Sequence, residues 1–145
     1  MAKSKLKDYI YRPEFECMTR TEMENLQSER LRKTVELVYN NCKPYRAKMD
    51  EFKIKPSDIK SVSDLSKLPF TVKHDLREAY PFGFYSSPSR DIVEVHASSG
   101  TTGKLTVVGY TQNDIDVWAE IAARSLAMAG VTKDSLVHVA YGYGL

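Results

Sequence analysis

Seven consecutive residues in the second half of the chain carry side chains suited to binding an anion. They are glycines, small hydroxyl residues and one lysine: Ser98, Ser99, Gly100, Thr101, Thr102, Gly103 and Lys104. Glycine allows successive backbone N–H groups to curl around an anion. The hydroxyls add further donors, and the lysine adds a mobile positive charge suited to phosphate. We therefore predict a polyphosphate-binding loop, although composition alone would also fit a solvated linker between two strands.

Two familiar phosphate-binding motifs do not fit this loop. A Walker A motif needs glycine five residues before its Gly-Lys pair and a hydroxyl residue after the lysine. Here Ser98 and Leu105 stand at those positions. The dinucleotide-binding motif needs a third glycine and a following helix, but β-rich sequence follows instead. The loop is therefore predicted to join two strands, without a helix dipole to assist it.

The sequence around the loop predicts an α/β arrangement. A short strand over 92–95 runs into the loop, and a second β-rich segment covers 105–110. Thr111 and Asp114 have the spacing of a capping box, which begins a long amphipathic helix that ends before Gly130. The apolar segment 136–140 is typical of a buried strand. Strand, helix and strand together predict a βαβ unit with some parallel pairing.

The first half of the chain is predicted to be mostly helical. Thr21 and Glu24 have capping-box spacing, and apolar residues follow at helical intervals until Lys43-Pro44. A second short helix is expected over 45–52, short helical turns over 55–68, and a third helix from about Thr71. We divide the chain into a helical cap, 1–60, and the beginning of a larger domain, 61–145.

Composition excludes several classes of protein. The 145 residues include 21 basic and 19 acidic side chains, a net charge of +2, and these are interspersed, which argues against nucleic acid as the main partner. Cys17 and Cys42 lack the spacing of a disulfide scaffold or a zinc site, so we expect a reducing cytoplasm. No run of eighteen apolar residues is present, which argues against a transmembrane helix.

The last residues, Tyr141-Gly142-Tyr143-Gly144-Leu145, form a glycine-aromatic turn directly after an expected buried strand. A natural domain usually ends in a polar tail or a docked element. We therefore expect the sequence to be part of a longer chain.

The complete loop string resembles the phosphate-binding signature of the adenylate-forming superfamily. Segments outside the loop are similar to the phenylacetate–coenzyme A ligase family. These are the residues at 68–77, 80–83, 95–97, 107–111 and 140–145. The resemblance extends from about Tyr11 to Leu145, and Leu105 departs from it where the family usually has proline.

The resemblance implies an adenylate-forming fold and a two-step acid–thiol ligase reaction. Phenylacetate would attack the α-phosphate of Mg-ATP, and coenzyme A would then displace AMP to give the thioester. The loop would hold the β- and γ-phosphates, with Mg²⁺ neutralising charge, while the ribose and catalytic-lysine contacts would lie beyond Leu145. No catalytic residue is assigned within these 145 residues, and the chain alone is expected to be inactive.

Family resemblance also places Tyr141, Gly142 and Tyr143 beside the aryl-acid site. The alternative is that both tyrosines are aromatic turn residues that pack on the long helix. His96 is interpreted as a strand residue with satisfied hydrogen bonds.

Two other functions stay open: a ligase for another aromatic acid such as indoleacetate or a benzoate, and a non-catalytic nucleotide-phosphate-binding module. Homodimers occur among similar enzymes, so the helical half is either a cap or part of a subunit contact.

Overall fold

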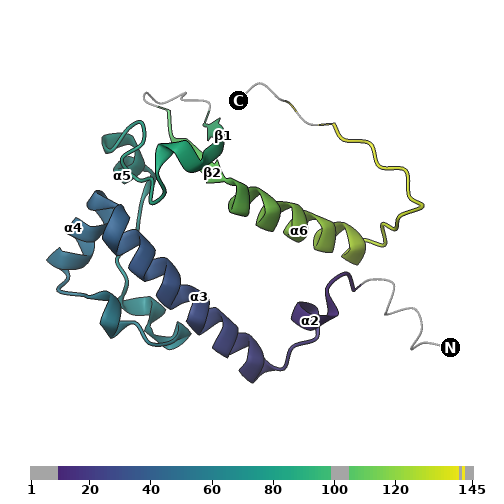
Figure 1. Ribbon diagram of the computed structural model, residues 1–145, viewed down its shortest axis with the longest axis horizontal. Helices are drawn as coiled ribbons and strands as arrows, with labels where there is room; N and C mark the ends of the chain where they lie inside the picture. The colour runs from purple at the N-terminus through teal and green to yellow at the C-terminus, as the bar shows by residue number, and fades with distance from the viewer. Residues whose placement is uncertain (1–9, 99–104, 141, 143–145) are drawn as a thin grey trace.

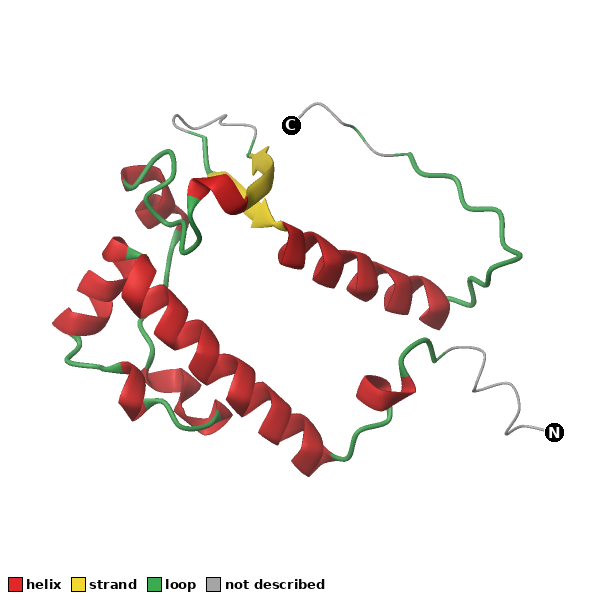
Figure 2. Ribbon diagram, in the orientation of Figure 1, coloured by secondary structure: helices red, strands yellow, loops and turns green. Residues whose placement is uncertain are grey.

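The computed structural model describes residues 10–98, 105–140 and 142. A helical first half leads to a small sheet and then to a long helix (Figures 1 and 2). The α-helices are α2 (Pro13–Glu16), α3 (Arg20–Asn41), α4 (Lys43–Glu51), α5 (Lys73–Glu78) and α6 (Gln112–Met128). The 3₁₀ turns are η2 (Pro56–Asp58), η3 (Val62–Lys67) and η4 (Ser89–Asp91), and the strands are β1 (Ile92–Ala97) and β2 (Val107–Thr111).

The long helix α3 begins two residues earlier than the sequence pattern predicted. Thr19, rather than Thr21, is the capping residue: its hydroxyl accepts a hydrogen bond from the Glu22 backbone N–H, 3.3 Å away. The Glu22 carboxylate in turn accepts the Thr19 backbone N–H at 2.8 Å. Both threonines have a glutamate three residues later, so spacing alone did not distinguish them. Backbone geometry does, because Thr19 is extended whereas Thr21 lies inside the helix.

This difference predicts unequal effects of two equivalent substitutions. Thr19→Ala removes the capping hydroxyl and should lower the free energy of unfolding by about 1 kcal/mol. Thr21→Ala, inside the exposed first turn, should leave it nearly unchanged. Urea denaturation of the two variants measures both values. Equal losses would contradict the assignment of Thr19 as the cap.

The core of the first half lies between α3, α4 and the turn that follows them. Val35, Met49 and Ile59 are buried, at 3%, 0% and 1% exposure, and pack together. Their partly buried neighbours come from the same region: Leu31, Tyr39, Tyr45, Ile54 and Leu68. The expected second helix and the short helical turns over 55–68 are confirmed. Pro44 occupies the first turn of α4, where its missing N–H costs no helical hydrogen bond.

The 3₁₀ turn η3 is capped by one carboxylate that has three donors. Asp64 accepts the backbone N–H groups of Lys60 and Ser61, at 2.9 and 3.1 Å, and pairs with Lys67 at 2.7 Å. The Lys67 hydrogen bond, followed by the two backbone bonds, lowers the pKa of Asp64 from 3.8 to about 2. Each of these contacts favours the charged carboxylate.

The lowered pKa predicts a specific pH dependence of stability. Because the folded pKa lies below the unfolded one, the stabilising contribution of Asp64 is complete above about pH 4 and is lost as the pH falls toward 2. The difference in unfolding free energy between the wild type and Asp64→Asn should therefore shrink across that window. Urea titrations at several pH values test this. A difference that stays constant from pH 5 to pH 2 would contradict it.

The two predicted strands on either side of the loop sequence are confirmed as an antiparallel pair. β1 and β2 align His96 with Val108 and Ala97 with Val107. The predicted capping box of the following helix is also present: Thr111 Oγ1 accepts the Asp114 N–H at 3.3 Å, and Asp114 accepts the Thr111 N–H at 2.8 Å. After α6 the chain turns at Gly130, whose φ of 89° is a conformation that favours glycine.

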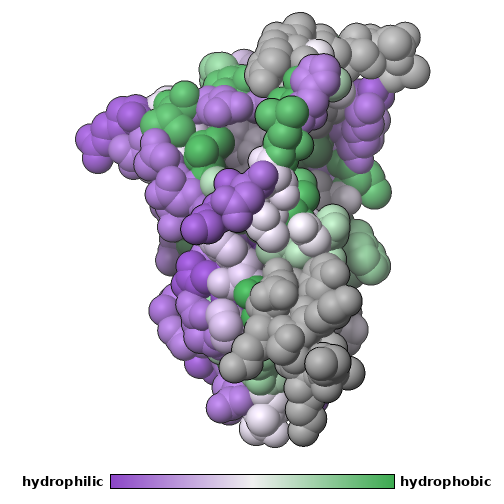
Figure 3. Space-filling model, turned by 90° about the vertical axis from the view of Figure 1, so that its right-hand side faces the viewer, coloured by the Kyte–Doolittle hydropathy of each residue, from purple (hydrophilic) through white to green (hydrophobic). Residues whose placement is uncertain are grey.

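The last part of the predicted βαβ unit does not form. Residues 135–140 have no regular secondary structure, and the two-stranded sheet holds only β1 and β2 in the described part of the chain. Leu136 and Val139 are 101% and 66% exposed. A strand needs an adjacent strand to satisfy its backbone groups, and no described segment supplies one. Hydrophobic residues consequently lie at the surface, as Figure 3 shows for one face.

Candidate phosphate-binding site

The ends of the predicted loop are held together by Ser98 and Thr106. The Ser98 N–H donates to the Thr106 carbonyl at 3.0 Å. The Thr106 N–H donates to the Ser98 hydroxyl oxygen at 3.1 Å. These two bonds extend the β1–β2 pairing by one step and close the base of the loop. The Ser98 oxygen accepts a hydrogen bond here, and its O–H can still donate to a ligand.

The other predicted loop residues lie outside the described residues, as do two of the three predicted substrate contacts. The loop residues concerned are Ser99, Gly100, Thr101, Thr102, Gly103 and Lys104, and the substrate contacts are Tyr141 and Tyr143. Gly142 is described and exposed, and a Cβ atom added there would meet none of the described residues within 4 Å. The roles of these residues therefore stay predictions.

An aromatic cluster lies next to the loop base, on the face that also carries Ser98. The His96 ring contacts Tyr110 at 5.4 Å and Trp118 at 5.8 Å between ring centroids. Tyr110 and Trp118 are 5.5 Å apart. His96 Nε2 also pairs with Glu94, which agrees with its interpretation as a strand residue with satisfied polar atoms. The alternation of a strand places His96 and Ser98 on one face, but sequence gave no signal that Trp118 would join them.

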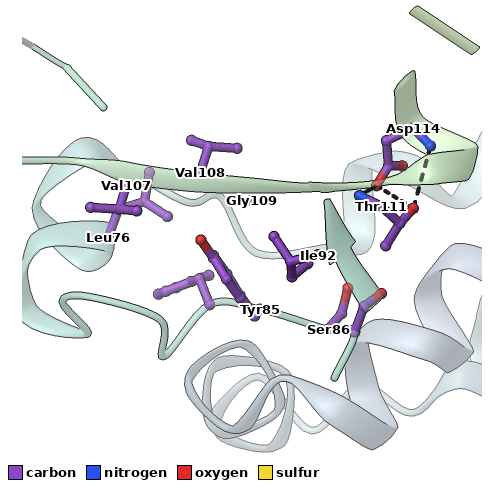
Figure 4. Close-up of a pocket in the computed structure, with 11 residues that line it drawn as sticks. Leu76, Tyr85, Ser86, Ile92, Val107, Val108, Gly109, Thr111 and Asp114 are labelled. Atoms are coloured by element: carbon purple, nitrogen blue, oxygen red, sulfur yellow. Dashed lines mark hydrogen bonds between the residues drawn. The ribbon is translucent and has the colours of Figure 1, made fainter. Parts of the chain in front are cut away.

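On the other face of β2, the same strand forms one wall of a small cavity of about 210 Å³. Figure 4 shows Tyr85 and Ile92 beside β2, with the Thr111–Asp114 cap at one end of the cavity. The Tyr85 hydroxyl oxygen is buried and lies against Gly109, and none of the described residues forms a hydrogen bond with it. Burial raises the pKa of the Tyr85 hydroxyl from its ordinary value. The Tyr85 ring packs against β2 at Gly109.

This contact explains why a glycine stands in β2. A Cβ atom at position 109 would lie 2.6 Å from both Cζ and the hydroxyl oxygen of Tyr85, too close for a nonbonded contact. Gly109→Ala should therefore lower the free energy of unfolding by about 1–3 kcal/mol. In a Tyr85→Leu background the same substitution should cost much less. A double-mutant cycle measured by urea denaturation checks this coupling, and additive effects would contradict the contact.

A second hollow, a groove of about 980 Å³, lies between α6 and the α2–α3 segment. Two crossed ion pairs link α6 with α2. Arg12, just before α2, pairs with Glu120 at 3.0 Å, and Arg124 pairs with Glu16 at 3.4 Å. The groove is lined by apolar α6 side chains and by cations of α3. Figure 1 shows α3 and α6 on its two sides.

No cluster of three or more histidine, cysteine or acidic side chains able to hold a metal occurs in the described residues. Both cysteines are free, with Cys42 buried and Cys17 exposed. Within the described part of the chain, no helix is long and apolar enough to cross a lipid bilayer.

Comparisons with known proteins relate this chain to coenzyme A ligases. No family model matches the chain. A phenylacetate–coenzyme A ligase of Thermus thermophilus is 49% identical over 136 residues, which cover 94% of this chain and 31% of that protein. The Escherichia coli phenylacetate–coenzyme A ligase is 53% identical over 124 residues, covering 86% of this chain and 28% of the relative. The chain resembles the N-terminal part of phenylacetate–coenzyme A ligases.

Solved structures of coenzyme A ligases share the fold. A 2-hydroxyisobutyryl-CoA ligase in its postadenylation state, in complex with 2-HIB-AMP, matches with a TM-score of 0.76 and 29% identity. The match covers 85% of this chain and 26% of the ligase. The same enzyme with 2-HIB-AMP and CoA in the thioesterification state also gives 0.76, at 30% identity. The chain spans 27–31% of the length of the curated phenylacetate–coenzyme A ligases it matches.

Proposed function

We propose that this chain supplies the ATP phosphate-binding part of a phenylacetate–coenzyme A ligase. The observation that carries the proposal is the roughly 50% identity to four curated ligases of that name, over 82–94% of the chain. The antiparallel hairpin, closed at its base by Ser98 and Thr106, supports it, because such a base holds the ends of the glycine-rich loop at a fixed separation.

The proposed reaction has two steps. A carboxylate oxygen of phenylacetate attacks the α-phosphorus of Mg-ATP, and the bond to the β-phosphate oxygen breaks, releasing pyrophosphate. The sulfur of coenzyme A then attacks the acyl carbon, and AMP leaves with the electron pair of the carbon–oxygen bond. The loop's N–H groups, hydroxyls and Lys104 would stabilise charge on the departing pyrophosphate. Ser98 would contribute its O–H as a donor.

The division of the chain into a helical cap, 1–60, and the beginning of an adenylation domain, 61–145, belongs to the same proposal. The three buried core residues Val35, Met49 and Ile59 all lie in the first segment, and Leu68 of the second segment packs against them. Tyr141, Gly142 and Tyr143 are proposed as aryl-acid contacts. The cytoplasmic location and the homodimer stay predictions.

The test is acid-dependent ATP–pyrophosphate exchange in the intact ligase that carries this segment. Phenylacetate, indoleacetate and benzoate are compared separately, without coenzyme A, so that only the first step is measured. Phenylacetate should give the fastest exchange. A higher rate with indoleacetate or benzoate would reassign the acid. ATP binding without exchange for any of the acids would favour the non-catalytic module and overturn the proposed reaction.

The 145-residue chain on its own should form no thioester, because the ribose and catalytic-lysine contacts of the reaction are proposed to lie outside it. A thiol-consumption assay with phenylacetate, ATP and coenzyme A measures this, with the intact ligase as the positive control. Thioester formation by the 145 residues alone would contradict the assignment of the chain as one part of the site.

A further inference from the structure

The aromatic cluster joins the base of the predicted loop to α6. His96 lies in β1, Tyr110 in β2 and Trp118 in α6, and each of the three rings contacts the other two. The His96 ring meets Tyr110 at 87° and Trp118 at 63°, which is the edge-to-face geometry that aromatic pairs favour. The two strands and the helix are therefore connected at one point, two residues before Ser98.

The β1–β2 hairpin needs a contact of this kind. A sheet of two strands is at best marginally stable on its own, so its strands take their position from what packs against them. The register of β1 is irregular between Ile92 and Glu94, and regular pairing runs from Glu94 to Ala97. His96 lies in this regular stretch, and its side chain is 25% exposed. The aromatic cluster therefore holds the part of β1 that leads into Ser98.

His96 makes two kinds of contact, and they differ in how firmly they hold it. Its Nε2 pairs with Glu94, whose side chain is 47% exposed, and an exposed ion pair contributes little to stability. Its ring contacts two aromatic side chains that come from different elements. An aromatic residue without ring nitrogens should therefore replace His96 with little loss of function, whereas an aliphatic residue should not.

The position of His96 bears directly on the hydroxyl of Ser98. Strand alternation places both side chains on one face of β1, and two residues of a strand span roughly 7 Å. Ser98 Oγ accepts the Thr106 N–H at 3.1 Å, which leaves the Ser98 O–H to donate to another group. A shift of β1 carries this donor with it. A misplacement of about 1 Å at a reacting centre can lower a rate roughly 100-fold.

We propose that His96 is a positioning residue for ATP. Packed against Tyr110 and Trp118, it holds the Ser98 hydroxyl at the place where this group donates to a phosphate oxygen. In this role His96 acts through Ser98 and does not itself contact the nucleotide. The inference rests on the proposed function, since it assumes that Ser98 binds an ATP phosphate.

A double-mutant cycle in the intact ligase that carries this segment tests the role. The variants are His96→Leu, Ser98→Ala and both together, and the readout is kcat/KM for ATP in phenylacetate-dependent ATP–pyrophosphate exchange. His96→Leu should lower this value about tenfold. In the Ser98→Ala background the same substitution should lower it less than about twofold, because the donor that His96 positions is gone. Equal losses in the two backgrounds would overturn the proposal.

Two matched variants separate positioning from a general loss of stability. His96→Phe keeps the ring and should stay within about threefold of the wild type, and a loss as large as that of His96→Leu would overturn the role of the ring contacts. His74→Leu makes the same change in α5, where His74 is exposed and faces Glu78 at 3.5 Å, and should stay within about twofold. If His96→Leu does not fold, His96→Gln, which also lacks the ring, takes its place with the same expected loss.

Failure of this proposal and failure of the proposed function give different results. Full exchange in His96→Leu, with an active wild type, overturns only the role of His96. If the wild type exchanges with none of the acids, the proposed reaction fails, and the Kd of Mg-ATP, measured by calorimetry, then tests His96. His96→Leu should raise this Kd about fivefold with Ser98 present and less than about twofold with Ser98→Ala. A wild type that neither exchanges nor binds Mg-ATP overturns both proposals.

Discussion

Replacing Lys104 by alanine together with Gly103 by valine is expected to lower phenylacetate-dependent ATP–pyrophosphate exchange by roughly 100-fold or more, since a single lost donor to a developing anion has an effect of that order. The alanine removes the only cation of the loop sequence. The valine adds a β-branched side chain where close approach of backbone N–H groups to phosphate is predicted. Exchange is measured in the intact ligase with saturating phenylacetate and varied ATP.

A matched control distinguishes loss of the loop from loss of a positive charge in general. Lys60 is an exposed lysine in the helical half, and no side-chain contact of Lys60 contributes to the core. Lys60→Ala should leave both the exchange rate and the KM for ATP within about twofold of wild type, as is usual for a surface substitution. Full exchange activity in the Gly103–Lys104 double variant would refute the assignment of this loop to the ATP phosphates.

Met49→Ala is expected to have the largest effect on stability, lowering the free energy of unfolding by about 2–5 kcal/mol. The Met49 side chain is completely buried, and it packs with Val35 and Ile59 between α3, α4 and η2. Truncation leaves a cavity that the neighbouring helices fill incompletely. Urea denaturation of the 145-residue chain measures the loss.

Met128→Ala provides the same chemical change at an exposed position. The Met128 side chain is 66% exposed at the end of α6, so its truncation should change the unfolding free energy of this chain by less than about 0.5 kcal/mol. A comparable loss in both variants would mean that the core of the chain is not the cluster around Met49. A loss confined to Met49→Ala confirms it.

Local signals predicted much of the fold. The Thr111–Asp114 cap, the turn at Gly130, the helix before Phe52 and the short turns between 55 and 68 all follow from short-range chemistry of capping, proline and glycine. The start of α3 was wrong by two residues because two overlapping threonine–glutamate pairs have the same spacing. Only the backbone conformation at Thr19 distinguishes them.

Long-range contacts were less accessible from the sequence. The segment 136–140 has the composition of a strand, but a strand forms only when another strand lies beside it, and composition carries no information about that neighbour. Trp118 has the periodicity of a core residue, yet it is 46% exposed, and its ring contacts those of His96 and Tyr110. Of the candidate phosphate site, sequence predicted the loop and its strands. The closure by Ser98 and Thr106 required the structure.

The crossed ion pairs between α2 and α6 have a consequence for how the protein is made. Arg12 and Glu120 are separated by 108 residues, so the partner of Arg12 does not yet exist when the helical half leaves the ribosome. At a synthesis rate of roughly 5–20 residues per second, the α2 segment waits about 5–20 s for α6. The core around Met49 lies within residues 31–68 and has no such delay. The helical half can therefore be structured first, with α2 attached to α6 only after the hairpin has been synthesised.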